Sequence, residues 1–158
     1  MQKSKWKTYV FWIVLTELVG ALAGFLSREG TELYQASVLK PALTPPGWIF
    51  PVVWGILYLL MGIAAARIAL LQESGAQRAA LRVYGLQLAV NFIWPLLFFN
   101  LQAFGAAFLW LVLLFALIVW MILSFRELDK TAAWLLLPYL LWTAFAGYLN
   151  LGVWLLNR

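Results

Sequence analysis

The sequence predicts an all-α membrane protein, a five-transmembrane-helix bundle with a long structured loop between the first and second helices. Two observations carry this prediction. Hydrophobic residues make up 65% of the 158 residues and charged residues 11%, which is about half the charged fraction of a soluble domain. Five apolar runs are each about 20 residues long, the length that crosses a bilayer. These runs cover residues 6–26, 48–70, 79–99, 103–125 and 132–155.

The runs leave few residues outside the membrane, so we expect one integral membrane domain over residues 1–158. There is no room for a separate soluble catalytic or nucleic-acid-binding domain, and the net charge of +5 is better explained by membrane topology than by a polyanionic partner. The chain has no cysteine and no histidine, which excludes disulfides, Cys or His metal sites and the usual axial ligands of haem. We therefore expect no metal site and no required cofactor.

The first span carries one ionisable residue and one small-residue motif. Glu17 lies near the middle of the span; it is either a functional acid or a protonated, hydrogen-bonded group at a helix interface. Gly20 and Gly24 have GxxxG spacing, which marks either a close helix contact or an accidental match. Because Glu17 interrupts the apolar region, we expect a retained span rather than a cleaved signal peptide.

The loop from Ser27 to about Gly47 leads directly into the second span. Its prolines remove backbone donors and push the residues before them toward extended conformations. Its hydrophobic residues argue against a solvated linker, so we expect it to fold back over the helix ends. In the helix that follows, aromatic residues four apart form one ridge, made of Phe50, Trp54 and Tyr58. We interpret the loop as the lid of a ligand site and the ridge as one of its walls.

The third span places Gln87, Asn91 and Trp94 on one face, and Pro95 predicts a kink just after them. Amide side chains in hydrocarbon are costly unless they find partners. They therefore either bridge helices or face a polar part of a ligand, and the sequence leaves both open.

The fourth span indicates little about function, whereas the fifth span contributes to the predicted site. The fourth span has no polar group at its centre and forms an antiparallel hairpin with the third. The fifth span presents Trp142, Ala146 and Leu149 along one face. We expect that face to take part in the site.

Topology follows from the distribution of Lys and Arg. Five spans place eight basic residues on one side, Lys3, Lys5, Lys7, Arg67, Arg78, Arg82, Arg126 and Lys130, and three on the other, Arg28, Lys40 and Arg158. The positive-inside rule therefore predicts a cytoplasmic N-terminus and an external first loop. The membrane we expect is a bacterial cell membrane.

The side chains available for chemistry favour binding. The chain has no charged relay typical of ion-coupled transporters and no convincing pair of nucleophile and base. It does offer flat aromatic surface with a few polar anchors, which suits a large planar hydrophobic ligand. The aromatic residues are Phe50, Trp54, Tyr58, Trp94 and Trp142, and the polar anchors are Gln87 and Asn91. The alternative is that these aromatics fill the bundle core or form an interfacial belt.

Several motifs together resemble the TspO family of tryptophan-rich sensory proteins, which is related to the mitochondrial translocator protein, also called the peripheral-type benzodiazepine receptor. The resemblance runs from the first loop to Asn150. The motifs are Lys40-Pro41, Thr44-Pro45-Pro46-Gly47, Phe50 with Trp54 and Leu57-Tyr58, Gln87-Leu88-Ala89 with Asn91 and Trp94, and Pro138-Tyr139-Leu140 with Trp142, Phe145-Ala146 and Leu149-Asn150.

The resemblance implies a five-helix bundle, commonly a homodimer, that binds porphyrins, haem and in some members sterols beneath the first loop. It implies a pocket lined by Trp54, Tyr58, Asn91, Trp94, Trp142, Ala146 and Leu149, with Pro45 and Pro46 in the lid. We add Phe50, Gln87 and Phe145 to this predicted set. Two departures matter. Leu33 and Leu43 stand where the family often has Trp or Phe, and Arg158 lies too far beyond Tyr148 for a sterol consensus, so we predict no sterol specificity.

Three functions follow as hypotheses. The first is a membrane receptor or carrier for tetrapyrroles, either porphyrin or haem, whose carboxylates meet Arg28, Lys40 or the amides of Asn91 and Gln87. The second is a light- and oxygen-dependent porphyrin-degrading enzyme that uses Trp54 and Trp142, as the resemblance implies for some members. The third is a stress sensor that acts through a protein partner. The sequence identifies neither the physiological ligand nor which of these is correct.

Overall fold

The apolar runs fold into long helices, and the computed structural model describes residues 4–158. In this range the elements are α1 (Lys5–Leu26), α2 (Arg28–Ser37), α3 (Ile49–Ala69), α4 (Gly75–Pro95), the π-helix η1 (Leu96–Asn100), α5 (Phe104–Arg126), α6 (Lys130–Leu135) and α7 (Leu137–Asn157). Five helical segments are long and apolar enough to cross a membrane, namely 5–26, 49–69, 75–100, 104–126 and 130–157. The predicted all-α architecture with five spans is confirmed.

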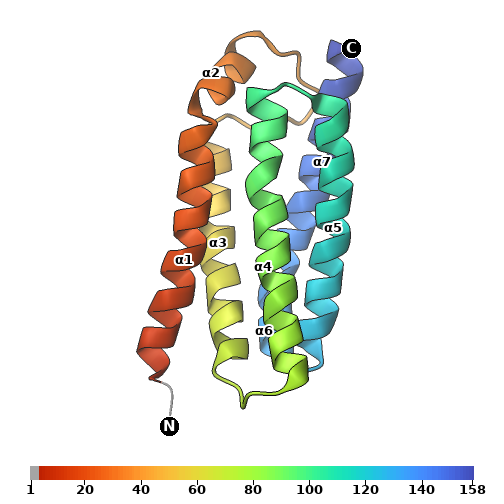
Figure 1. Ribbon diagram of the computed structural model, residues 1–158. Coiled ribbons are helices and arrows are strands. Elements are labelled where there is room, and N and C mark those ends of the chain that lie inside the picture. Colours follow the sequence, from red (N-terminus) through yellow and green to blue (C-terminus); the bar gives the residue numbers. More distant parts are fainter. Residues whose placement is uncertain (1–3) are drawn as a thin grey trace.

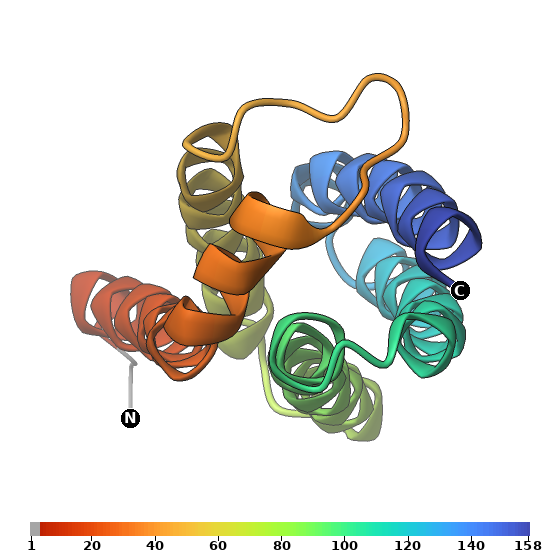
Figure 2. The ribbon, with the colours of Figure 1, turned by 90° about the horizontal axis from the view of Figure 1, so that it is seen from above.

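The long helices stand side by side, and the start of α1 lies at the opposite end of the bundle from α2 and the C-terminus (Figure 1). Seen from the end that carries α2, here called the loop end, they follow the order α1, α3, α7, α5 and α4 around the bundle (Figure 2). Helix α1 packs against α3, α4 against α5, and α5 against α7, while α6 fills the place between α3 and α5. Helix α2 lies across the space that the long helices enclose.

The turn between α3 and α4 is held by one glutamine. Ser74 caps α4 by accepting a hydrogen bond from the Gln77 backbone N–H at 3.1 Å. The Gln77 side chain then donates to the carbonyl oxygens of Ile68, Ala69 and Leu71 at 3.2 to 3.4 Å. These carbonyls lie at the end of α3 and in the turn that follows it, so the turn is fixed from both sides.

The first loop differs from the sequence prediction because its first half is helical. Helix α2 occupies residues 28–37, and only the part that contains the prolines is irregular. Gly30 explains how α2 can dock. A Cβ at this position would lie 2.5 Å from the backbone carbonyl of Phe99, so only glycine allows α2 to approach η1 this closely.

Two prolines interrupt the third and fifth spans. Helix α4 ends at Pro95 and continues as the π-helix η1, whose wider turn shows in a hydrogen bond from the Leu101 N–H to the Leu96 carbonyl at 3.1 Å. The predicted span 132–155 is likewise divided at Leu136 into α6 and α7. Pro138 has no N–H to continue the helical ladder, which accounts for the break.

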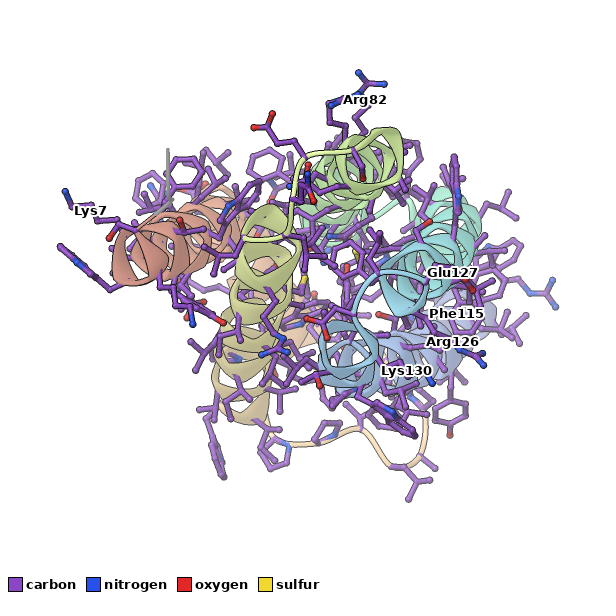
Figure 3. The ribbon with its side chains drawn as sticks, turned by 90° about the horizontal axis from the view of Figure 1, so that it is seen from below. Lys7, Arg82, Phe115, Arg126, Glu127 and Lys130 are labelled. Atoms are coloured by element: carbon purple, nitrogen blue, oxygen red, sulfur yellow. The ribbon has the colours of Figure 1, made fainter. Side chains whose placement is uncertain are left out.

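The half of the bundle toward the N-terminus contains the densest packing. Met61, Ala64 and Ala65 of α3 are fully buried, as are Met121 and Phe125 of α5. Figure 3 shows this end from below, with Lys7 and Arg82 projecting at its edge and with Arg126 and Lys130 at the same end of the bundle. The described basic residues counted on that side therefore do lie at one end, and Lys3 lies outside the described residues.

Candidate functional site

A cavity of about 570 Å³ lies at the loop end, enclosed by α1, α2, α3, α4, η1 and α7. This volume is within the range of small-molecule sites, about 300–1,000 Å³. The structure brings together, in its lining, eight of the residues that the sequence points to: Phe50, Trp54, Tyr58, Asn91, Trp94, Trp142, Ala146 and Leu149.

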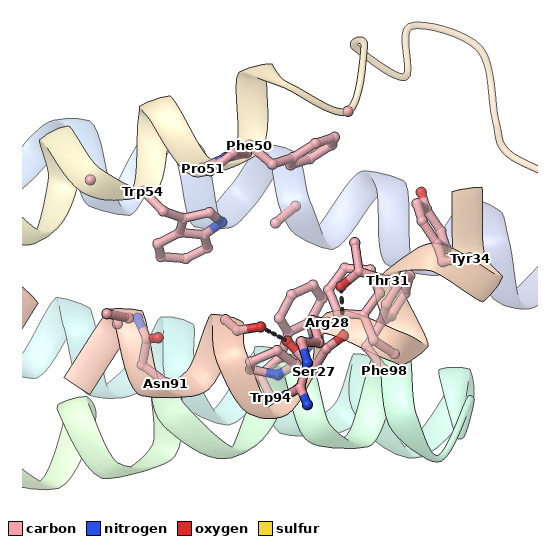
Figure 4. A pocket seen from close by; sticks show the side chains of 18 of the residues that line it. Ser27, Arg28, Thr31, Tyr34, Phe50, Pro51, Trp54, Asn91, Trp94 and Phe98 are labelled. Carbon is pink, nitrogen blue, oxygen red and sulfur yellow. Dashed lines mark hydrogen bonds between the residues drawn. The ribbon is translucent and has the colours of Figure 1, made fainter. Parts of the chain in front are cut away.

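The α3 wall of the cavity is the aromatic ridge predicted from the four-residue spacing. The rings of Trp54 and Tyr58 stack, with centroids 5.6 Å apart and planes at 29°. Trp54 also meets Tyr139 of α7 edge-on at 6.2 Å. Because Trp54 is held on two sides, it presents a flat, fixed surface to the cavity, and Figure 4 shows it projecting from α3 into the open space.

The facing wall is formed by α4 and η1. Trp94 stacks on Phe98 with centroids 5.0 Å apart and planes at 25°. Figure 4 places Asn91, Trp94 and Phe98 across the cavity from Trp54 and Phe50. The turn in the backbone after Pro95 brings Phe98 to the same side as Trp94, so two rings form a continuous surface.

A chain of hydrogen bonds closes the inner end of the cavity. The Tyr58 hydroxyl donates to Asn91 Oδ1 at 2.9 Å, and Asn91 Nδ2 donates to the Tyr139 hydroxyl oxygen at 2.6 Å. The Tyr139 hydroxyl in turn donates to Gln87 Oε1 at 2.7 Å. This chain connects α3, α4 and α7, and it satisfies amide groups that lipid could not. Gln87 and Asn91 thus bridge helices.

Trp94 is fixed in the same way. Its indole Nε1 donates to Asn150 Oδ1 at 3.0 Å, and Asn150 Nδ2 donates to the Phe104 carbonyl at 2.8 Å. The Nε1 of Trp142 is different, because it is buried without a hydrogen-bond partner among the described residues. Such an N–H is costly to leave unpaired.

Helix α2 supplies the roof of the cavity through Arg28, Thr31, Tyr34 and Gln35. Tyr34 is buried between Phe98 and Phe99, with ring centroids 5.4 and 5.3 Å away, and burial raises the pKa of its phenol. Lys40 donates to the carbonyls of Tyr34 and Val38 at 2.9 Å. Lys40 therefore caps the end of α2 instead of facing a ligand.

The segment after α2 is tied to α7. The Leu39 N–H donates to Asn157 Oδ1 at 3.0 Å, and Asn157 Nδ2 donates back to the Leu39 carbonyl at 2.8 Å. The Tyr148 hydroxyl donates to the Ala42 carbonyl at 2.8 Å. The predicted lid therefore lies against the bundle.

Four predicted site residues do not line the cavity. Pro45 and Pro46 lie in the irregular segment, and it is α2 with Gly47 that borders the cavity from the loop. Gln87 is fully buried behind Asn91 in the hydrogen-bond chain. Phe145 packs on Trp142 and Tyr148, with ring centroids 5.4 and 6.2 Å apart. The prolines stiffen the lid, whereas Gln87 and Phe145 support the residues that do border the space.

Sequence reasoning missed the contribution of α1 to the lining. Glu17, Gly20, Ala21 and Gly24 all border the cavity. Their spacing of three, four and seven residues places them on one helical face, so a search for a small and polar stripe could have found them. A Cβ on Gly20 would overlap the Tyr58 ring, whereas one on Gly24 meets nothing within 4 Å. The GxxxG motif is thus a packing contact at its first glycine only.

Comparison with known proteins places the chain in a family. The model of the TspO/MBR family matches residues 12–155. The chain belongs to the TspO/MBR family. It is 34% identical over 154 residues to the tryptophan-rich protein TspO of Chlorobaculum tepidum, which covers 95% of this chain and 96% of that protein. It is 36% identical over 147 residues to the translocator protein of Bos taurus, which covers 89% of this chain and 87% of that protein.

A third relative in the TspO/MBR family carries a different name. Protein CrtK of Rhodobacter capsulatus is 38% identical over 122 residues, covering 77% of this chain and 76% of that protein. The match to the family model includes every residue that lines the cavity, from Glu17 to Asn150. The family resemblance seen in the motifs is therefore confirmed, and the chain is a membrane protein of this family.

Proposed function

We propose that the chain is a membrane receptor or carrier that holds a tetrapyrrole, porphyrin or haem, in the cavity at the loop end. One observation carries the proposal: Trp54, Tyr58, Trp94 and Trp142 from three different helices line a single cavity. Flat rings stack favourably on other flat rings, and no polar group of Asn91 or Trp94 is left over to demand a small polar ligand. The bovine relative is named a translocator protein, and translocation begins with a bound ligand.

Arg28 is the cationic group of the lining. It donates one hydrogen bond to the Phe25 carbonyl at 2.7 Å, and a guanidinium has five N–H donors, so others can reach a carboxylate. We expect Arg28→Gln to weaken binding of protoporphyrin, a dicarboxylic acid, and to leave binding of its dimethyl ester unchanged. Equal losses for both ligands would show that Arg28 acts on the fold and not on the carboxylates.

The direct test is a parallel titration of purified protein with protoporphyrin, haem and a sterol. We expect Trp54→Ala to raise the Kd for protoporphyrin about fivefold, since the loss of one stacked ring is worth on the order of 1 kcal/mol. Trp134→Ala is the matched control, because Trp134 is 69% exposed and does not border the cavity. The same affinity in both variants and in the unmodified protein would remove the pocket from the proposal.

A second candidate function is light- and oxygen-dependent breakdown of the bound porphyrin. It is favoured by the presence of Trp54 and Trp142 in the same lining, since both indoles would lie beside the ligand. An absorbance time course under illumination separates the two functions. A passive binder bleaches porphyrin no faster than the free dye bleaches, whereas an enzyme accelerates bleaching and loses this acceleration in Trp54→Phe and Trp142→Phe.

We also propose that the loop end faces the outside of a bacterial cell membrane and that the end near the N-terminus faces the cytoplasm. The support is the excess of Lys and Arg at the N-terminal end. The chain has no cysteine, so the single variants Leu43→Cys and Ser74→Cys can each be tested for labelling in intact cells. We expect a membrane-impermeant thiol reagent to label Leu43→Cys and not Ser74→Cys. The homodimer and a role as stress sensor stay predictions.

A further inference from the structure

The wall between α1 and α3 changes along its length. In the middle of the bundle the two helices touch: a Cβ on Gly62 of α3 would lie 2.6 Å from the Cα of Ile13, and one on Gly20 of α1 would overlap Tyr58. Toward the loop end they separate, and α2 lies across the space between them (Figure 2). Here a Cβ on Gly24 or on Gly55 meets no atom within 4 Å. Both glycines nevertheless line the cavity.

Three of the cavity-lining residues in this region are exposed, namely Ala21 and Gly24 of α1 and Pro51 of α3. Exposed lining residues on both helices indicate that side chains do not close the space between α1 and α3 here. Gly55 lies six residues into α3, about 9 Å along a helix axis, so the opening lies within the membrane-spanning part of the chain.

We propose that this opening is a lateral portal, through which a membrane-dissolved ligand passes between the bilayer and the cavity. The proposal rests on the proposed function for the identity of the ligand, but not for the opening itself. The ligand it fits is an amphiphile with a flat apolar body and an acidic edge. Such a molecule lies in the outer part of the bilayer with its carboxylates at the membrane interface. Arg28 comes directly after the end of α1 and therefore lies at the same level.

The route through the loop is the alternative, and contacts oppose it. Passage there must break the two hydrogen bonds between Leu39 and Asn157 and the one from Tyr148 to Ala42. It must also lift Pro41 from Gly152, where a Cβ would lie 2.6 Å from the proline ring. The portal requires no such rupture, because small residues already leave the wall open.

The first test narrows the portal with Gly24→Leu and Gly55→Leu together, in liposomes that contain protoporphyrin. Each position has room for a side chain, so we expect the fold to be kept. A narrowed passage slows access and escape alike. We expect the association rate constant to fall about tenfold, whereas leucines that only take up space in the cavity would instead raise the dissociation rate constant. Gly85→Leu is the matched control, because Gly85 of α4 also has open space and does not border the cavity.

The second test holds the loop in place with Pro41→Cys and Gly152→Cys. A Cβ on Gly152 would lie 2.6 Å from the Pro41 Cβ, closer than the separation of about 3.8 Å in a disulfide, so the loop must move back by about 1 Å when the bond forms. The reduced form of the same protein is the control. We expect oxidised and reduced forms to bind at the same rate. Slowed binding in the oxidised form, with unchanged rates in the leucine variant, would overturn the portal in favour of the loop. A leucine variant with a faster dissociation rate and an unchanged association rate would also overturn it, because the glycines would then be ligand contacts only.

A third readout needs no tetrapyrrole. Lipids with brominated acyl chains quench indoles that they can reach, and the contribution of Trp54 is obtained by difference with Trp54→Phe. We expect the brominated lipids to quench the fluorescence of Trp54, and we expect less quenching in the double variant Gly24→Leu and Gly55→Leu. Absence of quenching would contradict the portal even if porphyrin binds. Quenching in a protein that binds no tetrapyrrole would keep the portal and refute the proposed ligand.

Discussion

The two halves of the bundle use small residues for opposite purposes. Toward the N-terminal end, the small residues Gly62, Ala64 and Ala65 of α3 allow neighbouring helices to pack in close contact. Met61 beside them has no exposed surface. Toward the loop end, Gly24 and Gly55 leave space that no side chain fills. In a membrane, helix association depends on close packing, because lipid supplies no hydrophobic drive between helices. The packed half therefore holds the bundle together, whereas the open half keeps a cavity.

The largest expected effect is that of Gly62→Val. Its Cβ would lie 2.6 Å from the Ile13 Cα, and backbone cannot move aside as a side chain can. We expect the free energy of unfolding in detergent to fall by about 3 kcal/mol or more. Gly55→Val, seven residues earlier on α3, is the matched control and should change unfolding little, because its Cβ meets no atom. Equal destabilisation by both would refute the contrast between the two halves.

An intermediate effect is expected from Tyr139→Phe, at the boundary of the two halves. This change removes the hydroxyl that accepts from Asn91 and donates to Gln87, leaving two buried amides without that partner. The free energy of unfolding should fall by about 1–3 kcal/mol. Tyr148→Phe removes a hydroxyl that bonds only to the exposed loop at Ala42, and it serves as the control. Comparable unfolding midpoints for the two variants would show that the hydrogen-bond chain contributes little.

The smallest effect concerns Asp129 at the N-terminal end. Burial raises the pKa of this carboxyl, but hydrogen bonds from Arg67 and from the N–H groups of Ala132 and Thr131 outweigh burial and bring the pKa below its usual value. The ionised form therefore stabilises the fold above the unfolded-state pKa of about 3.9. That stabilisation is lost as the pH falls through the lower folded-state pKa.

Asp129→Asn keeps the N-cap of α6 while removing the ion pair, whose Arg67 Nε to Asp129 Oδ2 distance is 2.8 Å. Because Arg67 is 36% exposed, we expect a loss of less than about 1 kcal/mol at pH 7. The difference from the unmodified protein should shrink as the pH falls through the folded-state pKa, which lies below the usual value. A difference that does not change as the pH is lowered from 7 would assign the effect to something other than the ion pair.

The sequence predicted the spans and the aromatic lining because both depend on local patterns. Apolar runs of fixed length mark the membrane helices, and the four-residue spacing of Phe50, Trp54 and Tyr58 marks one face of α3. Gln87 and Asn91 show the limit of such patterns. Their periodicity placed them on one face, but whether they met a ligand or a helix depended on Tyr139, far away in the chain.

Helix α2 and the α1 lining were not predicted for a different reason. A ten-residue helix without a strong apolar run is marginal by itself, and α2 is stabilised by Gly30 and Tyr34 packing against η1. The opening between α1 and α3 depends on how two helices diverge, which no local pattern encodes. Tertiary contacts determined both features.

The central claim is that the open half holds a flat ligand between its aromatic walls, and filling that space tests it most directly. Ala146 borders the cavity and is 8% exposed, whereas Leu141 of the same helix is 68% exposed and faces outward. Protoporphyrin titrations of folded Ala146→Phe and Leu141→Phe should show affinity reduced at least about tenfold in the first and unchanged in the second. Full affinity in Ala146→Phe would place the ligand elsewhere and contradict the account.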